Sequence, residues 1–411
     1  MDFSDTPEEA AFRAEVRAFL DANAQRKTAE ARSANKSRAM TPEQVAASKA
    51  WQRKKAEAGF AGILWPKKYG GREGTPMQHV IFLQEEEKYV VPISVFNQGV
   101  NMALPTIMAH GTEEQIARHA RPALFGDEIW CQLFSEPAAG SDLAGLRTRA
   151  VRDGDNWVVN GQKIWTSNAH FSDFGMLMTR TDPAMAKHAG LTFFMVDMRA
   201  PGIEVRPIKQ IAGTSNFCEV FLSDVRIPDS QRLGSVGAGW KVALTMLANE
   251  RLAVSKAEGP DFEDIFLLAR SVELDGRPAV EDGAVRERLA NWYVQTVGVH
   301  YTRLRSNTAL SRGKTPGPEN SIGKLVGASK AQEIATFGID LMGMAGAVMD
   351  PELAPMEAWF QQALLYSPGK RIAGGTDEIL RNIIAERVLG LPGEVRADKG
   401  IAFADIPTSS R

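Results

Sequence analysis

The chain has 411 residues, of which 44% are hydrophobic and 24% are charged, and its formal net charge is −2. This length predicts two or three domains, and the near-neutral charge argues against a protein that binds nucleic acid or an anionic membrane through charge. No apolar run reaches the ~20 residues of a membrane span, and residues 1–5 are too acidic for a secretory signal.

The cysteine and histidine content argues against disulfide and metal chemistry. Cys131 and Cys218 both lie in predicted strands, where buried free thiols are the expected state, and this favours a reducing compartment such as the cytoplasm. The six histidines are scattered, and the sequence has neither an HExxH motif nor paired Cys-x-x-Cys motifs. We therefore expect a cytoplasmic protein without a metal site.

Residues 1–128 are predicted to form helices, because four helix starts share one pattern. In each, a threonine is followed three residues later by Glu or Gln, the arrangement in which the two side chains bond each other's backbone amides. A proline at the first helical position supports three of the four starts. The predicted caps are Thr6, Thr41, Thr75 and Thr112.

Residues 129–232 are predicted to form a β-domain, since short apolar runs alternate there with turn signals. Asp153-Gly154 and Asn160-Gly161 are dipeptides typical of hairpin turns. Several short strands separated by turns favour a compact antiparallel barrel or sandwich. Strands are expected at 156–159, 175–178, 191–196 and 217–222.

Residues 233–411 return to the helical period, beginning at Trp240. Further helices are predicted at about 285–310, from about 321 onward, and at about 376–388. The expected fold therefore has an N-terminal α-helical domain, a central antiparallel β-domain and a C-terminal four-helix bundle.

Two segments of the β-region carry hydroxyls and small residues beside predicted strands. The first runs from Phe134 to Leu143 and the second from Gln162 to Asn168. A flavin requires hydrogen-bond donors at its ring edge and its pyrophosphate, and small residues let backbone amides approach them. Taken alone, the first segment could equally be a surface turn, and the alternative for Trp165 is a core aromatic in a hairpin. The pairing of the two segments favours a cofactor site.

These paired segments, the helical flanks and the run Arg381–Arg387 resemble the acyl-CoA dehydrogenase family over nearly the whole chain. The resemblance implies FAD as cofactor, an acyl-CoA substrate and an electron-transfer flavoprotein as electron acceptor. It also implies a homodimer or homotetramer, with a hetero-oligomer as the alternative, and no nucleic-acid or membrane partner. The implied cofactor-binding residues are Phe134, Ser135, Ser141, Trp165, Ser167, Arg312, Thr376 and Glu378, and the implied substrate-binding residues are Ser141 and Arg251.

The family resemblance gives several of these residues a specific role. Trp165 would pack on the flavin ring, and the Ser167 hydroxyl would bond near its N5. Arg312 would take the place of an arginine that reaches the FAD of a neighbouring subunit. Thr376 and Glu378 match flavin contacts, but they equally fit the N-cap and the first turn of the last helix.

The family carries its catalytic glutamate at one of two positions. One position directly precedes Gly-Thr near the C-terminus and is Gly374 here, which cannot accept a proton. The other directly precedes an arginine on the helix after the β-domain, and here it is Glu250. The resemblance therefore implies that Glu250 takes the α-proton and that FAD takes the β-hydride, giving the trans-2-enoyl-CoA. Spacing alone favours a solvated helix charge at Glu250, and the absence of a glutamate at 374 reverses that preference.

Gly374 keeps its backbone N–H, and the resemblance implies that this group binds the thioester oxygen during α-proton removal. The ordinary alternative is that the double glycine only provides backbone freedom before the last helix. Two other functions also stay open. One is a catalytically silent subunit of a hetero-oligomer, and the other is an offshoot acting as an acyl-CoA oxidase or flavin monooxygenase.

Overall fold

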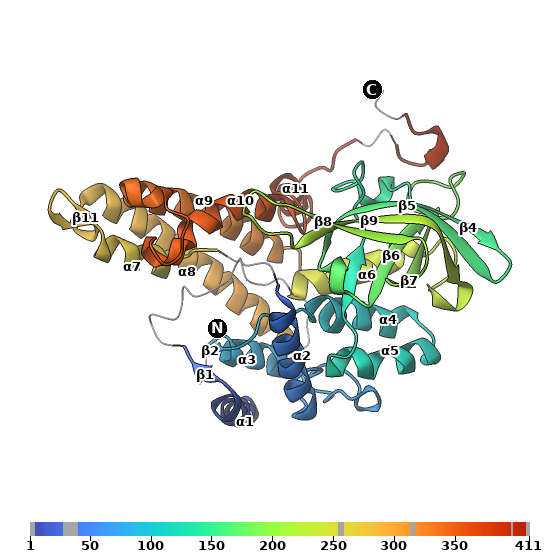
Figure 1. Cartoon of the computed structure of the whole chain (residues 1–411), viewed down its shortest axis with the longest axis horizontal. Helices are drawn as coiled ribbons and strands as arrows, with labels where there is room; N and C mark the ends of the chain where they lie inside the picture. Colours follow the sequence, from blue (N-terminus) through green and yellow to red (C-terminus); the bar gives the residue numbers. More distant parts are fainter. Residues whose placement is uncertain (1–4, 28–39, 254–258, 313–316, 396–397, 408–411) are drawn as a thin grey trace.

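The computed structural model describes residues 5–27, 40–253, 259–312, 317–395 and 398–407, without the side chains of residues 250–253, 310 and 311. Figure 1 shows N-terminal helices packed below a β-domain, and a bundle of long helices that extends away from both. The chain therefore has a helical N-terminal part, a central sheet and a helical C-terminal part, as the sequence predicts.

The N-terminal helices begin where their caps predict. At Thr6, Thr41, Thr75 and Thr112, the hydroxyl accepts from the backbone amide three residues on, whose side chain accepts in return from the cap amide. A π-helical turn, η3 (Gly99–Ala103), leads directly into α4 and packs against the first helix after the β-domain. The helices are α1 (Pro7–Asn23), α2 (Pro42–Glu57), α3 (Pro76–Glu86), α4 (Leu104–His110) and α5 (Glu113–Phe125).

The central sheet has the strand order β10-β7-β6-β4-β5-β9-β8, with β3 paired to β6. Most neighbours are antiparallel, but β3 and β4 each run parallel to β6, which the expectation of an all-antiparallel domain did not include. The strands are β3 (Trp130–Leu133), β4 (Arg149–Asp153), β5 (Asn156–Ser167), β6 (Phe174–Arg180), β7 (Leu191–Asp197), β8 (Ile203–Ile208), β9 (Phe217–Pro228) and β10 (Arg232–Leu233).

One of the two predicted hairpin turns is correct and the other is wrong. The Asp153-Gly154 signal marks the turn between β4 and β5, but β5 continues straight through Asn160-Gly161 with a break in its pairing to β9. The glycine is needed there for close approach, since a Cβ on Gly161 would lie 2.3 Å from Thr148 Oγ1. The dipeptide therefore lies opposite a bulge, where Ser223 and Asp224 of β9 face one residue of β5.

The C-terminal helices pack mainly around α9, which contacts α7, α8, α10 and α11. Both predicted long helices and the predicted last helix are present. Two helices, α7 and α10, and a small hairpin of β11 (Glu273–Leu274) and β12 (Arg277–Pro278) were not predicted. The helices are α6 (Gly239–Ala253), α7 (Phe262–Ser271), α8 (Gly283–Ser311), α9 (Asn320–Leu341), α10 (Trp359–Ile372) and α11 (Asp377–Arg387).

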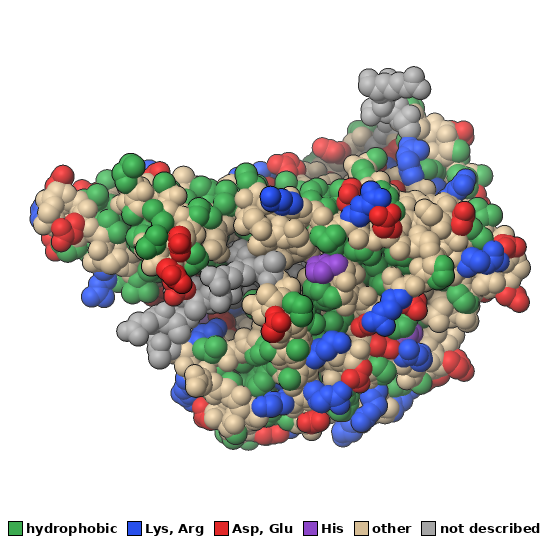
Figure 2. All heavy atoms as spheres, viewed as in Figure 1, with side chains coloured by type: hydrophobic (Ala, Val, Ile, Leu, Met, Phe, Trp, Pro, Cys, Tyr) green, Lys and Arg blue, Asp and Glu red, His purple; other side chains and the backbone are tan. Residues whose placement is uncertain are grey.

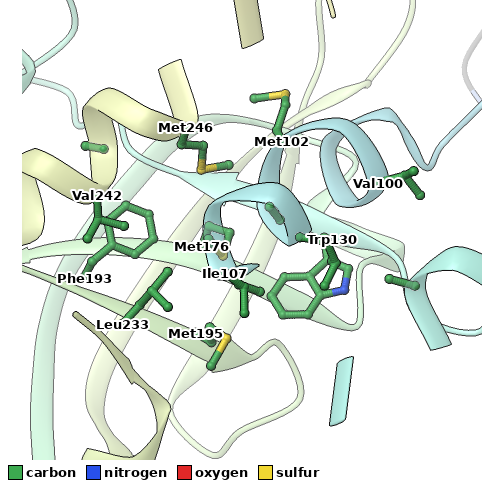
Figure 3. Packing of buried hydrophobic residues seen from close by; sticks show 14 of the residues in the cluster. Val100, Met102, Ile107, Trp130, Met176, Phe193, Met195, Leu233, Val242 and Met246 are labelled. Atoms are coloured by element: carbon green, nitrogen blue, oxygen red, sulfur yellow. The ribbon is translucent and has the colours of Figure 1, made fainter. Parts of the chain in front are cut away.

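One of the hydrophobic clusters joins part of the N-terminal helices, the sheet and α6. Trp130 of β3 and Phe193 of β7 face side chains from the helices in this core, as Figure 3 shows. Val242 and Met246 hold one face of α6 in it. The helix α6 therefore packs against both other layers, and it contacts η3 and α4.

The surface fits the balanced composition. On the face shown in Figure 2, Lys and Arg side chains are interspersed with Asp and Glu, so that no continuous patch of one sign covers it. None of the described helices combines the length and the apolar character that crossing a bilayer demands. Cys131 and Cys218 are buried free thiols, as expected, and burial raises the pKa of Cys131 to about 12.

Candidate functional site

The two segments singled out in the sequence lie side by side. The Ile164 amide in β5 donates to the Ser135 carbonyl at 2.9 Å, and the Lys163 ammonium donates to the Phe134 carbonyl at 3.1 Å. These backbone and side-chain hydrogen bonds therefore hold the loop after β3 against β5. This pairing brings together Ser135, Trp165 and Ser167, which stand thirty or so residues apart in the sequence.

A buried ion pair fixes this junction. Lys163 is 0% exposed and Glu136 is 8% exposed, and Lys163 Nζ lies 2.8 Å from Glu136 Oε1. The same carboxylate accepts from the backbone amides of Arg147 at 2.6 Å and Thr148 at 2.9 Å. Burial raises the pKa of Glu136, but the ammonium and the hydrogen bonds outweigh it, and the pKa lies below its ordinary value.

Sequence reasoning missed both members of this pair, although each lies inside one of the two segments. Lys163 continues the two-residue alternation of the buried Trp157 and Val159 along β5, and this is the signal that could have found it. Neither charge is positioned to meet a ligand, because both are enclosed. Their contribution is to hold the loop of residues 134–142 against β5.

Trp165 is exposed on this scaffold. Its side chain is 56% exposed, and its backbone adopts φ 59°, in the stretch where β5 loses register with β9. A left-handed backbone at a bulky residue costs free energy and turns the indole out of the strand. The alternative of a core aromatic is therefore wrong for Trp165.

The neighbouring hydroxyls are also available. Ser135 and Ser167 are half-buried, and neither hydroxyl makes a hydrogen bond within the described part of the chain. Ser141 is exposed at the far end of the first segment. By contrast, the Phe134 ring is buried and packs edge-on against Phe193, 5.6 Å between centroids, so only its backbone can meet a cofactor. An exposed aromatic beside free hydroxyls fits a flat ring with polar edges.

The end of β5 also contacts the helical bundle. The Asn168 amide donates to the Asn216 carbonyl at 3.0 Å, and Asn216 Nδ2 donates to the Tyr366 hydroxyl of α10 at 2.7 Å. The turn that holds Gly374 follows directly after α10. The end of β5 is thus connected through Asn216 and Tyr366 to α10, the helix that leads into this turn.

The turn between α10 and α11 is shaped by two glycines. Gly374 has φ 64° and Gly375 has φ 100°, a left-handed pair that disfavours other residues. Lys324 of α9 donates to the Gly375 carbonyl. This turn therefore has a defined backbone, in which the Gly374 N–H is a candidate donor.

The start of α11 confirms the capping interpretation. Thr376 Oγ1 accepts from the Ile379 amide at 3.2 Å. Glu378 is exposed in the first turn, and its own backbone amide and then Thr376 lower the pKa of its carboxyl. A flavin contact from either residue stays a prediction, which the cap geometry allows.

Three remaining site residues are placed only in part. Glu250 and Arg251 lie near the C-terminal end of α6, but their side chains are outside the described residues. Their neighbour Asn249 donates to Thr106 Oγ1 at 3.3 Å, so this end of α6 faces α4. Arg312 is exposed just after α8. Among the described residues, no group of His, Cys, Asp and Glu could hold a metal ion.

Comparison with models of known protein families identifies the family of this chain. Three models match in succession: acyl-CoA dehydrogenase N-terminal domain at residues 6–127, middle domain at 131–225 and C-terminal domain at 237–389. The chain belongs to the acyl-CoA dehydrogenase family. It is therefore an oxidoreductase that acts on acyl-CoA, and FAD, which the site residues fit, is its cofactor.

Individual relatives agree with this family. The chain is 39% identical to acyl-CoA dehydrogenase FadE34 of Mycobacterium tuberculosis over 342 residues, 82% of this chain and 45% of that protein. It is 37% identical to acyl-CoA dehydrogenase IpdE1 of the same organism over 355 residues, 85% of this chain and 89% of that protein. The chain thus spans less than half of FadE34 but most of IpdE1.

Solved structures show the same fold. The Tcur3481-Tcur3483 steroid acyl-CoA dehydrogenase is similar with a TM-score of 0.78 and 28% identity, over 96% of this chain and 100% of that one. The ChsE4-ChsE5 complex from Mycobacterium tuberculosis is similar with a TM-score of 0.76 and 29% identity, over the same shares.

Proposed function

We propose that this chain catalyses FAD-dependent α,β-dehydrogenation of an acyl-CoA thioester, with Glu250 as the base that removes the α-proton. The observation that supports the cofactor site best is the exposed Trp165 between two available hydroxyls, on a junction fixed by Lys163 and Glu136. When bound, FAD supplies a hydride acceptor for the β-carbon. We further propose an electron-transfer flavoprotein as the acceptor that reoxidises the enzyme.

Glu250 suits the base role because of where α6 lies. The helix packs on η3, α4 and β7, and Asn249, directly before Glu250, donates to Thr106 of α4, so this end of the helix borders the N-terminal helices. A carboxylate removes an α-proton best in a dry site that raises its pKa towards neutrality. Arg251, the next residue, is proposed to bind the coenzyme A part of the substrate.

Gly374 is proposed to stabilise the charge that develops on the thioester oxygen. Its left-handed backbone, at φ 64°, fixes the direction of the N–H at the turn before α11, and a preorganised donor of this kind favours the enolate-like transition state. The remaining cofactor contacts, from Ser135, Ser141, Thr376 and Glu378, are proposed on the same basis, and Arg312 is proposed to contact FAD.

The substrate is proposed to be a branched or cyclic acyl-CoA. Gly374 has no side chain at the position where other members carry glutamate, which leaves space beside the α and β carbons. The names of similar proteins support this class: a steroid acyl-CoA dehydrogenase at 28% identity, and cyclohexane-1-carbonyl-CoA dehydrogenase of Syntrophus aciditrophicus at 27% identity.

A panel of acyl-CoA thioesters tests this function. The purified protein should be yellow, and an anaerobic cyclic acyl-CoA should bleach its flavin faster than a straight-chain one. A protein that binds no FAD, or whose flavin stays oxidised with every thioester, would contradict the proposal. Rapid peroxide release in air would identify an oxidase instead.

The double substitution Glu250→Gln/Gly374→Glu tests the geometry of the site. Glu250→Gln alone should abolish flavin reduction, and the glutamate placed at 374 should restore part of it for short straight acyl-CoA but little for bulky ones. If the double variant is folded and yellow but none of the acyl-CoA thioesters reduces its flavin, this arrangement is contradicted.

A second candidate is a subunit that depends on a partner chain. One similar structure is described as the ChsE4-ChsE5 complex, and Gly374 cannot supply a base. In this case the isolated chain would bind little FAD, and addition of the partner would restore binding. A homo-oligomer that is yellow and active alone would exclude it.

A further inference from the structure

The described C-terminal residues 398–407 lie on the β-domain, away from the helical bundle in which α11 ends (Figure 1). Their backbone is bonded to the loop between β6 and β7. The Phe403 amide donates to the Met185 carbonyl and the Ala404 amide to the Pro183 carbonyl, each at 2.9 Å. Ala402 also forms a β-bridge with Ala186. The segment is therefore docked at a defined place.

Arg180, the last residue of β6, lies beneath this segment. Its buried guanidinium donates to the carbonyls of Ala144 at 2.6 Å and Leu146 at 3.1 Å. The guanidinium also contacts the Phe403 ring of the C-terminal segment, and the ring centroid is 3.4 Å from the guanidinium carbon. One side chain thus joins the C-terminal segment to the loop of residues 142–147, which continues the Phe134–Leu143 segment.

The buried positive charge of Arg180 is stabilised by these carbonyls and by the Phe403 ring. Among the described residues, no carboxylate lies within ion-pair distance of its guanidinium, and burial lowers its pKa to about 10. It therefore stays charged at neutral pH. Carbonyl oxygens and the face of an aromatic ring are the groups that compensate such a buried cation.

A second connection runs parallel to the first. Lys187 is 8% exposed, and its ammonium lies 2.5 Å from Asp142 Oδ2 and 2.9 Å from Asp398 Oδ2. Asp142 directly follows Ser141, and Asp398 belongs to the C-terminal segment. Both connections therefore begin in the C-terminal segment and end in the loop of residues 142–147, which directly follows Ser141.

We propose that Phe403 and Asp398 are positioning residues, which act through Arg180 and Lys187 to hold the 142–147 loop in the conformation that binds FAD. This inference rests on the proposed function in one respect, the assignment of Ser141, which directly precedes this loop, to FAD binding. The C-terminal family model ends at residue 389, so the segment lies beyond the residues that the three family models match.

Hydrogen exchange in the flavin-free full chain tests the positioning itself. The Gly145 and Leu146 amides bond to the Asp142 and Leu143 carbonyls within the loop. In Phe403→Leu, which keeps an apolar side chain but removes the ring face, these amides should exchange at least about threefold faster, since a cation–π contact of this kind is lost. Phe403→Tyr keeps the ring and should restore the original rates. Amides of β8 are the internal reference.

The acidic residues of the segment provide a matched pair. Asp398→Asn removes one partner of Lys187, whereas Asp405→Asn changes an exposed carboxylate of the same segment. Faster exchange is expected in the first variant and not in the second. Equal loop exchange in the wild type, Phe403→Leu and Asp398→Asn would overturn the proposal, whether or not the protein binds FAD.

FAD titration then tests the consequence for the cofactor. The dissociation constant of FAD should rise about fivefold in Phe403→Leu and return towards the wild-type value in Phe403→Tyr. Faster loop exchange with unchanged FAD affinity would overturn the link to the cofactor. If the wild type itself bound no FAD, the proposed function would fail, while the exchange rates would still decide whether the segment positions the loop.

Discussion

The β-domain fixes its half of the site with buried side chains, whereas the turn before α11 fixes its half with backbone geometry. In the first half, Lys163 and Glu136 clamp the two segments that present Trp165 and the serine hydroxyls. In the second half, Gly374 and Gly375 adopt left-handed conformations. The first arrangement should thus be sensitive to loss of charge, and the second to any added Cβ.

Lys163→Met should have the largest effect, because it leaves the Glu136 carboxylate buried without its cation. Breaking one side of a buried pair costs roughly 3–5 kcal/mol, measurable as a lower free energy of unfolding in denaturant titrations. The double variant Lys163→Met/Glu136→Gln should recover part of the loss. A single variant within about 1 kcal/mol of the wild type would show that the pair does not clamp the segments.

Gly374→Ala should destabilise the protein by roughly 1–2 kcal/mol, the cost of a left-handed backbone at a residue with a Cβ. The matched control is Gly369→Ala in α10, where a Cβ meets nothing within 4 Å. The control should be neutral or stabilising, since alanine favours a helix over glycine. Thermal unfolding of both variants measures the contrast, and equal shifts would refute the backbone argument for the turn.

Trp165→Ala should separate cofactor binding from folding. The indole is exposed, so the free energy of unfolding without flavin should change by less than about 0.5 kcal/mol. Loss of an aromatic contact worth roughly 1–1.5 kcal/mol should weaken FAD binding about tenfold. Fluorescence titration with FAD gives the dissociation constant. Unaltered affinity would mean that the indole does not pack on the ring.

Ser167→Ala should have the smallest effect. One ring hydrogen bond contributes about 0.5–1.5 kcal/mol, so FAD affinity or the rate of flavin reduction should fall by less than about tenfold. Ser223→Ala, on β9 and distant in sequence from both segments, is the control and should leave FAD affinity unaltered. If the two variants behave alike, the Ser167 hydroxyl does not bond the flavin.

Local chemistry made much of the fold predictable. The four threonine caps were correct because each capping box is complete within four residues of sequence. The Asn160-Gly161 turn was wrong because the same dipeptide also fits a bulge, and only pairing with β9 decides between them. The parallel pairing of β3 with β6 joins strands far apart in the chain, which periodicity does not encode.

The site likewise has features that local sequence predicts and features that depend on contacts between distant residues. Its segments were found because hydroxyls and glycines cluster locally, and their pairing across β5 agrees with that prediction. The Lys163–Glu136 pair was missed, since the two charges are 27 residues apart and charged residues usually mark surface. The contact of Phe403 with Arg180 was missed for the same reason, because it joins the end of the chain to the end of β6.

The central claim is that Glu250 removes the α-proton, and anaerobic single-turnover reduction of the bound flavin tests it most directly. Wild type, Glu250→Gln and the control Glu263→Gln, an exposed glutamate in the first turn of α7, are each loaded with FAD and mixed with an acyl-CoA that bleaches the wild type. We predict that Glu250→Gln keeps its FAD but loses reduction by at least about a hundredfold, since a catalytic base commonly contributes 10²–10⁴-fold. Bleaching at the wild-type rate in a folded, yellow Glu250→Gln protein would contradict the account.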